Sequence, residues 1–267
     1  KGHEPISFDM SYFSTKSDQR GIFRGWFGQS RFFAKSRWYL PVHATSKKAH
    51  QYDISLTTIQ NASIPISYQY QGRQSGENST EPLRFSLDKI HFLKKFLEAG
   101  YTDINQMVAI SKTHVSMHHK GKSFTVEFLD GRVSRYKRIS KFSEKLGEDT
   151  ELIYRLEEEI MPNKNRVLYF YDSLQSKCLT EIQTKDPTGS HIYAWIRFHF
   201  WGKNQDVLQI ETSDGQVVTY SFRDDKDDLY HLSAIMRTKT PEKAFAYHPR
   251  TSMIKTKKEG ENLTHNV

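Results

Sequence analysis

The sequence contains a single cysteine, Cys178, among its 267 residues, and it has no long hydrophobic run. A single thiol excludes a disulfide within the chain. No apolar stretch reaches the roughly 18 residues that a membrane-spanning helix needs, and the most aromatic stretch, 192–201, is interrupted by Arg197 and His199. Cys178 alternates with the apolar residues of a predicted strand, which favours a buried, inert thiol. We therefore expect no transmembrane segment and no thiol chemistry.

Motifs of nucleotide and cofactor sites are also absent. The segment 24–28 is rich in glycine, but it lacks the Lys-Ser/Thr pair and the strand-to-helix context of a phosphate loop. Around Ser173 the flanking glycines of a nucleophile elbow are missing. We expect no cofactor, and these absences favour a protein that is not an enzyme.

Composition indicates a folded, basic protein. Hydrophobic residues make up 36% of the chain and aromatic residues 13%, so a core rich in aromatic side chains can form. The formal net charge of +8 favours anionic partners, such as nucleic acid, lipid head groups or glycans, although it also serves solubility. Lys1 rather than Met begins the chain, which favours an exported or organellar protein after removal of a leader, with the compartment left open.

Alternating apolar and polar residues predict antiparallel strands over much of the chain. Two hairpins are predicted across Asp130-Gly131 and Asp214-Gly215, because Asp-Gly pairs tolerate positive φ angles. The segment 191–200 alternates without interruption. The predicted fold class is α+β, antiparallel and β-rich with a few amphipathic helices.

Apolar residues at helical spacing predict three such helices. The first begins at a capping Ser86 and ends at Gly100. The second occupies about 149–161, before Pro162. The third covers about 224–236, and its acidic first turn complements the helix dipole.

The same patterns predict the domain organisation. We expect a β-rich N-terminal domain with one helix over 1–110, a sheet-plus-helix region over 111–240 and a basic polar tail over 241–267. The middle region contains two hairpin-helix blocks, 111–161 and 165–237. With strands closed by a C-terminal helix, the second block resembles the pleckstrin-homology fold, a resemblance that carries no function by itself.

Two surfaces are candidates for binding. Aromatic residues and arginine are concentrated at binding hot spots, and the polar side of the strand near 191–199 carries both; the alternative is that another element covers this side. Basic residues after the first hairpin could hold phosphate groups, although a solvated surface is the simpler interpretation. The residues concerned are His191, Tyr193, Trp195, Arg197 and His199 on the first surface, and Arg132, Arg135, Lys137 and Arg138 on the second.

A metal site is considered at His114, His118 and His119. On a strand or a helix two of these imidazoles could meet one ion, but no convincing third or fourth ligand is nearby, so we expect no metal.

A catalytic alternative comes from three residues of two predicted strands. Asp172, Glu181 and Gln183 loosely resemble the metal-binding arrangement of the PD-(D/E)xK nucleases, which implies Mg²⁺-dependent cleavage of a phosphodiester. Gln183 stands where that family has lysine, and no proline precedes Asp172.

The function that we predict is that of a non-enzymatic binding or assembly module within a larger complex. It holds a protein partner, or an anionic one, through a basic surface that bears aromatic residues. The alternative is a metal-dependent nuclease or another phosphodiester-acting enzyme that uses Asp172 and Glu181.

Overall fold

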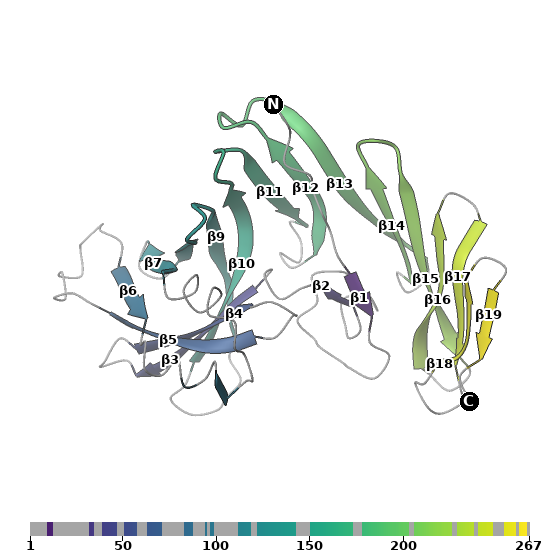
Figure 1. Cartoon of the computed structure of the whole chain (residues 1–267), viewed down its shortest axis with the longest axis horizontal. Coiled ribbons are helices and arrows are strands. Elements are labelled where there is room, and N and C mark those ends of the chain that lie inside the picture. Colours follow the sequence, from purple (N-terminus) through teal and green to yellow (C-terminus); the bar gives the residue numbers. More distant parts are fainter. Residues whose placement is uncertain are drawn as a thin grey trace. The chain divides into compact units, whose positions relative to one another are not determined.

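The computed structural model is built of β-strands (Figure 1). It describes residues 10–12, 32–34, 39–46, 51–57, 63–70, 83–87, 94, 97, 98, 112–118, 122–142, 150–172, 178–202, 206–225, 229–237, 240–247, 254–259 and 262–265. The first nine strands are β1 (Met10–Tyr12), β2 (Phe32–Ala34), β3 (Tyr39–Ser46), β4 (Gln51–Thr57), β5 (Ser63–Tyr70), β6 (Leu83–Leu87), β7 (His114–His118), β8 (Ser123–Glu127) and β9 (Val133–Phe142). The next ten are β10 (Thr150–Ile160), β11 (Arg166–Tyr171), β12 (Leu179–Lys185), β13 (Ile192–Trp201), β14 (Val207–Thr212), β15 (Val217–Asp225), β16 (Leu229–Arg237), β17 (Thr240–Tyr247), β18 (Ile254–Glu259) and β19 (Asn262–His265).

Strands β7 to β16 form an open antiparallel sheet in which each strand pairs with the next one along the chain. The antiparallel, β-rich part of the prediction is thereby confirmed. The chain divides into two compact units, one made of 35–168 and the other of 1–34 with 169–267. In the first unit β10 pairs with β9 along most of its length and also with β3.

The helix predicted over 149–161 is wrong, because this segment is strand β10. Its Leu156 lies opposite Tyr136 of β9, and Tyr154 and Leu156, two positions apart, are both fully buried. Leu, Arg and Glu favour a helix locally, but the partner strands supply backbone hydrogen bonds and a buried face that outweigh this preference.

The helix predicted over 224–236 is wrong for the same reason. Asp224 lies in β15, opposite Tyr230 of β16. The closing helix of a pleckstrin-homology fold is therefore not formed. Among the described residues from 112 to 237 none is helical.

Most of the first predicted helix, which ends at Gly100, lies outside the described residues. Ser86, expected as its cap, lies in β6, whereas Lys94, Leu97 and Glu98 have helical backbone. No helix within the described residues is long and apolar enough to cross a membrane.

Each unit has a core of its own. In the first, the rings of Phe124 and Tyr154 meet edge to face with their centroids 4.7 Å apart. Val115, Val126, Tyr136 and Leu156 complete this core. In the second, the buried side chains are Tyr169, Cys178, Leu179, Ile182, Ile196, Phe198, Leu208, Phe222 and Leu232, so the expectation of a buried thiol is confirmed.

Three hairpin turns, at 128–132, 161–165 and 212–216, have the same backbone hydrogen bonds. In each, the backbone carbonyl of the first residue accepts a hydrogen bond from the N–H of the fourth residue. The N–H of the first residue donates to the carbonyl of the fifth. The fourth residue has a positive φ, which is the geometry of a three-residue loop with a left-handed residue before the return strand. These left-handed residues are Gly131 (φ 86°), Lys164 (φ 70°) and Gly215 (φ 82°), and the first and last confirm the two Asp-Gly turns.

A tyrosine follows each of these left-handed residues by five positions. Tyr136 and Tyr169 are buried and Tyr220 is half-buried, so the turn and the tyrosine recur together. The turn sets the register of the hairpin, and the register places the ring on the inner face.

Acidic or amide side chains accept hydrogen bonds within the turns and stabilise them. Asp130 accepts from the N–H of Arg132, and Asn163 from that of Asn165, both at 2.9 Å. Between β12 and β13, Asp186 accepts from the Thr188 hydroxyl, the His191 N–H at 2.8 Å and the Ser190 hydroxyl. The Thr188 hydroxyl above all, with the His191 N–H, lowers the pKa of Asp186 from 3.8 to about 2.

Replacing Gly131 or Gly215 by alanine should destabilise its unit by about 1 kcal/mol, because an L-residue is strained at these φ angles. A Cβ at either site meets no atom within 4 Å, so the effect is one of backbone alone. Lys164→Ala is the control, since a non-glycine residue already occupies that turn. Urea unfolding measures all three variants, and equal losses in all of them would contradict the prediction.

Asp186 should make stability depend on pH under acidic conditions. Its folded pKa of about 2 lies below the ordinary 3.8, so its stabilisation is complete above about pH 4 and is lost as the pH falls toward 2. Unfolding in urea at pH 5, 3 and 2 should show this loss in the wild type and a smaller one in Asp186→Asn. Titration of the carboxyl at its ordinary pKa, followed by NMR, would refute the prediction.

Candidate binding surfaces

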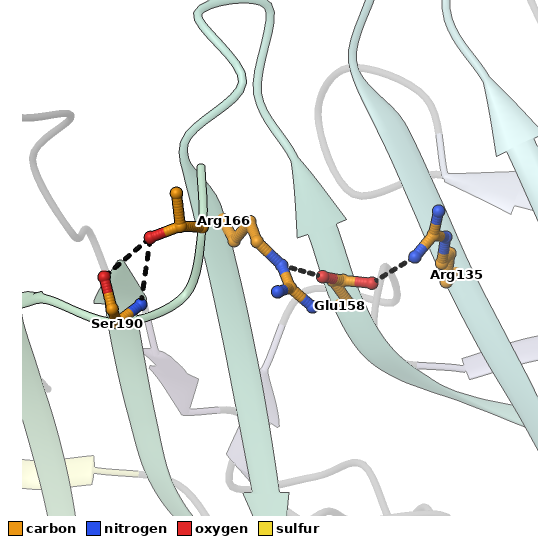
Figure 2. Close-up of polar contacts among 5 residues, drawn as sticks. Arg135, Glu158, Arg166 and Ser190 are labelled. Carbon is orange, nitrogen blue, oxygen red and sulfur yellow. Dashed lines mark hydrogen bonds and ion pairs between the residues drawn. The ribbon is translucent and has the colours of Figure 1, made fainter. Parts of the chain in front are cut away.

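Glu158 of β10 joins the strands on both of its sides. Its Oε2 accepts from Nη1 of Arg135 on β9 at 2.7 Å, and its Oε1 accepts from Nε of Arg166 on β11 at 2.5 Å. Figure 2 shows Glu158 between the two guanidinium groups. Only 9% of its side chain is exposed, so a buried carboxylate holds two arginines that reach the surface.

Glu159, the next residue, points to the opposite face, as consecutive strand residues must. Its Oε1 accepts from Nη1 of Arg132 at 3.2 Å and from the hydroxyl of Ser134, its neighbour on β9, at 3.3 Å. The Arg132 guanidinium also lies 4.1 Å above the Phe128 ring. Two buried carboxylates of β10 are thus neutralised on opposite faces of one sheet.

Glu157 completes the acidic run at a bulge, where the β9–β10 register shifts between Leu156 and Glu158. Its carboxylate lies 3.0 Å from Nη2 of Arg155 and 3.8 Å from Nζ of Lys137. Cations outnumber carboxylates in this arginine cluster, which consists of Arg132, Arg135, Lys137, Arg155 and Arg166 with Glu157, Glu158 and Glu159. The excess is two positive charges.

Of the basic residues predicted as one surface, Arg135 and Lys137 share a face of β9, as expected from their spacing. Arg138 alternates to the other face, lies opposite Tyr154 and is half-buried. The sequence reading missed their acidic partners. The run of three glutamates, 157–159, is a usable signal, but a helix over this segment would leave it unpaired with the arginines of a neighbouring strand.

The second candidate surface lies on β13. As predicted, Ile196 and Phe198 are buried, while the residues between and beside them point outward. We define the β13 outer face as Tyr193, Trp195, Arg197, His199 and Trp201, which alternate along this strand. The predicted His191 precedes the strand, with its ring 5.2 Å from that of Tyr193.

Arg197 is held at the centre of the β13 outer face. Its guanidinium lies 4.1 Å above the Trp195 ring, and its Nε donates to Glu181 of β12 at 3.2 Å. None of the described residues accepts a hydrogen bond from its Nη atoms. On the other side of β13, His199 lies 3.5 Å from Glu211 of β14. Arg197 is thus matched by one carboxylate, and a second carboxylate lies beside His199.

Of the three residues of the nuclease hypothesis, Glu181 and Gln183 lie in β12 and Asp172 follows β11. The N–H of Asp172 donates to the carbonyl of Cys178 at 2.8 Å. Glu181 is three positions beyond Cys178, about 10 Å farther along β12, and it is bound to Arg197. Gln183 lies on the same strand, opposite Trp195.

Two of the three predicted histidines, His114 and His118, lie in β7, with His114 exposed; His119 is outside the described residues. In the part of the chain that the structure describes, no group of three or more His, Cys, Asp or Glu side chains could hold a metal ion.

Neither a search of protein-family models nor one of curated proteins finds a match. Among solved structures, a porin-like protein from Bacteroides uniformis ATCC 8492 is similar over 87% of this chain and 95% of its own, at 10% identity and a TM-score of 0.33. The N-terminal domain of effector protein SpvB from Salmonella typhimurium strain LT2 is similar over 100% and 96%, at 11% identity and a TM-score of 0.37. Likenesses this remote say nothing of function.

Removing the Glu158 carboxylate should cost far more stability than removing that of Glu157. We expect a loss of about 2–3 kcal/mol in Glu158→Ala, because two charged hydrogen bonds disappear from a buried site. Glu157 is 36% exposed, and Glu157→Ala should cost about 0.5 kcal/mol or less. Chemical denaturation of both variants provides the comparison, and similar losses would count against a special role of Glu158.

Proposed function

We propose that this protein is a non-enzymatic binding or assembly module that holds a protein partner through the β13 outer face. The observation that supports this most is the row of aromatic and polar side chains on β13, of which Arg197, His199 and Trp201 are exposed. Trp, Tyr and Arg are the residue types that contribute most to protein interfaces, and here they stand together. The side chain of Arg197 is 45% exposed and Trp201 is 44% exposed.

Arg197 is already held in place by its neighbours before a partner binds. Trp195 and Glu181 hold the Arg197 guanidinium by stacking and by a hydrogen bond. Fixing a side chain in advance reduces the entropy that is lost when a complex forms. Packed Ile196 and Phe198 on the reverse side keep the strand itself in place.

Charge favours a protein over a polyanion at this face. Arg197 and His199 are each paired with a glutamate, so the face has little excess charge to attract nucleic acid. A partner surface that offers a carboxylate to the Nη groups of Arg197 and an apolar side chain to Trp201 matches what remains. Such contacts combine directional hydrogen bonds with apolar burial, as the centres of protein interfaces do.

Truncating Arg197 or Trp201 should abolish capture of a protein partner. In pull-downs from the native cells, Arg197→Ala and Trp201→Ser should each lose the partner retained by the wild type, with Kd rising about 30-fold for loss of a hot spot of about 2 kcal/mol. The wild-type complex should persist at about 0.5 M salt, which screens exposed charges but not apolar contacts.

Arg135→Ala is the matched control, since it removes an arginine from a different surface. It should retain the partner. If Arg197→Ala captures the same proteins as the wild type, or if only nucleic acid or lipid is recovered and is released by salt, the proposal fails.

A further inference from the structure

Glu158 fixes two arginine side chains on one face of the sheet and leaves most of their donors available. A guanidinium has five N–H donors, and Arg135 and Arg166 each use one of them on Glu158. Both carboxylate oxygens of Glu158 are occupied by these bonds. The carboxylate therefore orients the two guanidinium groups, which come from the strands on either side of β10 (Figure 2).

The exposure of the three side chains is graded. Glu158 is 9% exposed, Arg166 32% and Arg135 54%. The negative charge thus lies underneath, while the positive groups reach solvent. One carboxylate neutralises only one of two arginines. Lys137, two positions from Arg135 on the same face, is 64% exposed and lies 3.8 Å from Glu157, a carboxylate that it shares with Arg155.

Oxyanions with several oxygens fit this arrangement. Guanidinium groups bind phosphate through paired, parallel N–H···O bonds, and such bonds are stronger than neutral ones. A phosphate group can present different oxygens to two guanidinium groups at once, whereas a planar carboxylate is matched by one. The net positive charge of the cluster favours a doubly charged group.

We propose that Arg135 and Arg166, oriented by Glu158 and assisted by Lys137, form a binding site for a phosphate group. Its source is either a small soluble phosphate compound or a phosphomonoester lipid head group. The site lies in the unit of residues 35–168, and the β13 outer face lies in the other unit. It therefore shares no residue with the β13 outer face.

Two variants with the same net charge distinguish orientation of the arginines by Glu158 from simple electrostatic attraction of an anion. Glu158→Gln and Glu157→Gln each add one positive charge to the cluster, and attraction alone predicts tighter binding of an anion by both. If Glu158 orients the arginines, Glu158→Gln should bind about tenfold more weakly despite its extra charge, whereas Glu157→Gln should bind as well as the wild type or better.

The probes are inorganic diphosphate, titrated by calorimetry at low salt, and vesicles of phosphatidylcholine with and without phosphatidic acid. Arg166→Gln and Arg135→Gln should also weaken binding about tenfold or more, and Lys122→Gln, at an exposed lysine elsewhere, should not. The arginine variants keep the test valid if Glu158→Gln does not fold, which circular dichroism would show. Arg197→Ala should bind diphosphate like the wild type.

Binding of diphosphate alone, with this pattern of variants, indicates a soluble phosphate compound. Binding of phosphatidic acid vesicles as well, with the same pattern, indicates a membrane source. The proposal is overturned if neither probe binds, if binding survives in Arg166→Gln, or if Glu158→Gln binds more tightly than the wild type.

Discussion

The pair of buried carboxylates on β10 constrains the first unit more than any other interaction. Glu158 and Glu159 are adjacent in the chain and face opposite sides of the sheet, and each is met there by arginine. A slip of one residue would exchange the faces and leave two buried charges without their partners, at a cost of several kcal/mol. Because Arg135 comes from β9 and Arg166 from β11, the two charges specify the order of three strands as well as their register. The bulge at Glu157 accommodates the irregular pairing beside them.

Register in the hairpins depends on a repeated turn. The same pattern of hydrogen bonds joins β8 to β9, β10 to β11 and β14 to β15, each time with a left-handed fourth residue and a tyrosine five positions later. A loop of fixed length aligns the returning strand so that its apolar residues reach the inner face and its polar residues the outer one. The outward side chains of β9 and β11, two strands that follow such turns, are therefore placed by turn geometry. The proposed phosphate site, with Arg135 on β9 and Arg166 on β11, lies on these two strands.

The two surfaces differ in how their charges are balanced. On β13 Arg197 and His199 each lie beside a glutamate, and what remains exposed is aromatic surface with the Nη donors of Arg197. In the arginine cluster five cations share three carboxylates, so positive charge remains in excess. The first arrangement suits a protein partner of mixed polarity and the second a small, strongly charged anion. The net charge of +8 could not distinguish these cases, because it counts charges without their partners.

Local patterns in the sequence were sufficient for the turns at Gly131 and Gly215 and for the alternation of β13, because a positive φ or a buried face every second residue is encoded by neighbouring residues. The antiparallel, β-rich class followed from the same signals. Local patterns failed at β10 and β16, whose residues suit a helix when taken alone and become strands because partner strands supply hydrogen bonds and a buried face. The residues of the proposed phosphate site also fall into a part that local patterns predict and a part that they do not. Arg135 and Lys137 could be found from their spacing, but Glu158 and Arg166 join them only through pairing across β10, and long-range pairing is a property that tertiary structure alone decides.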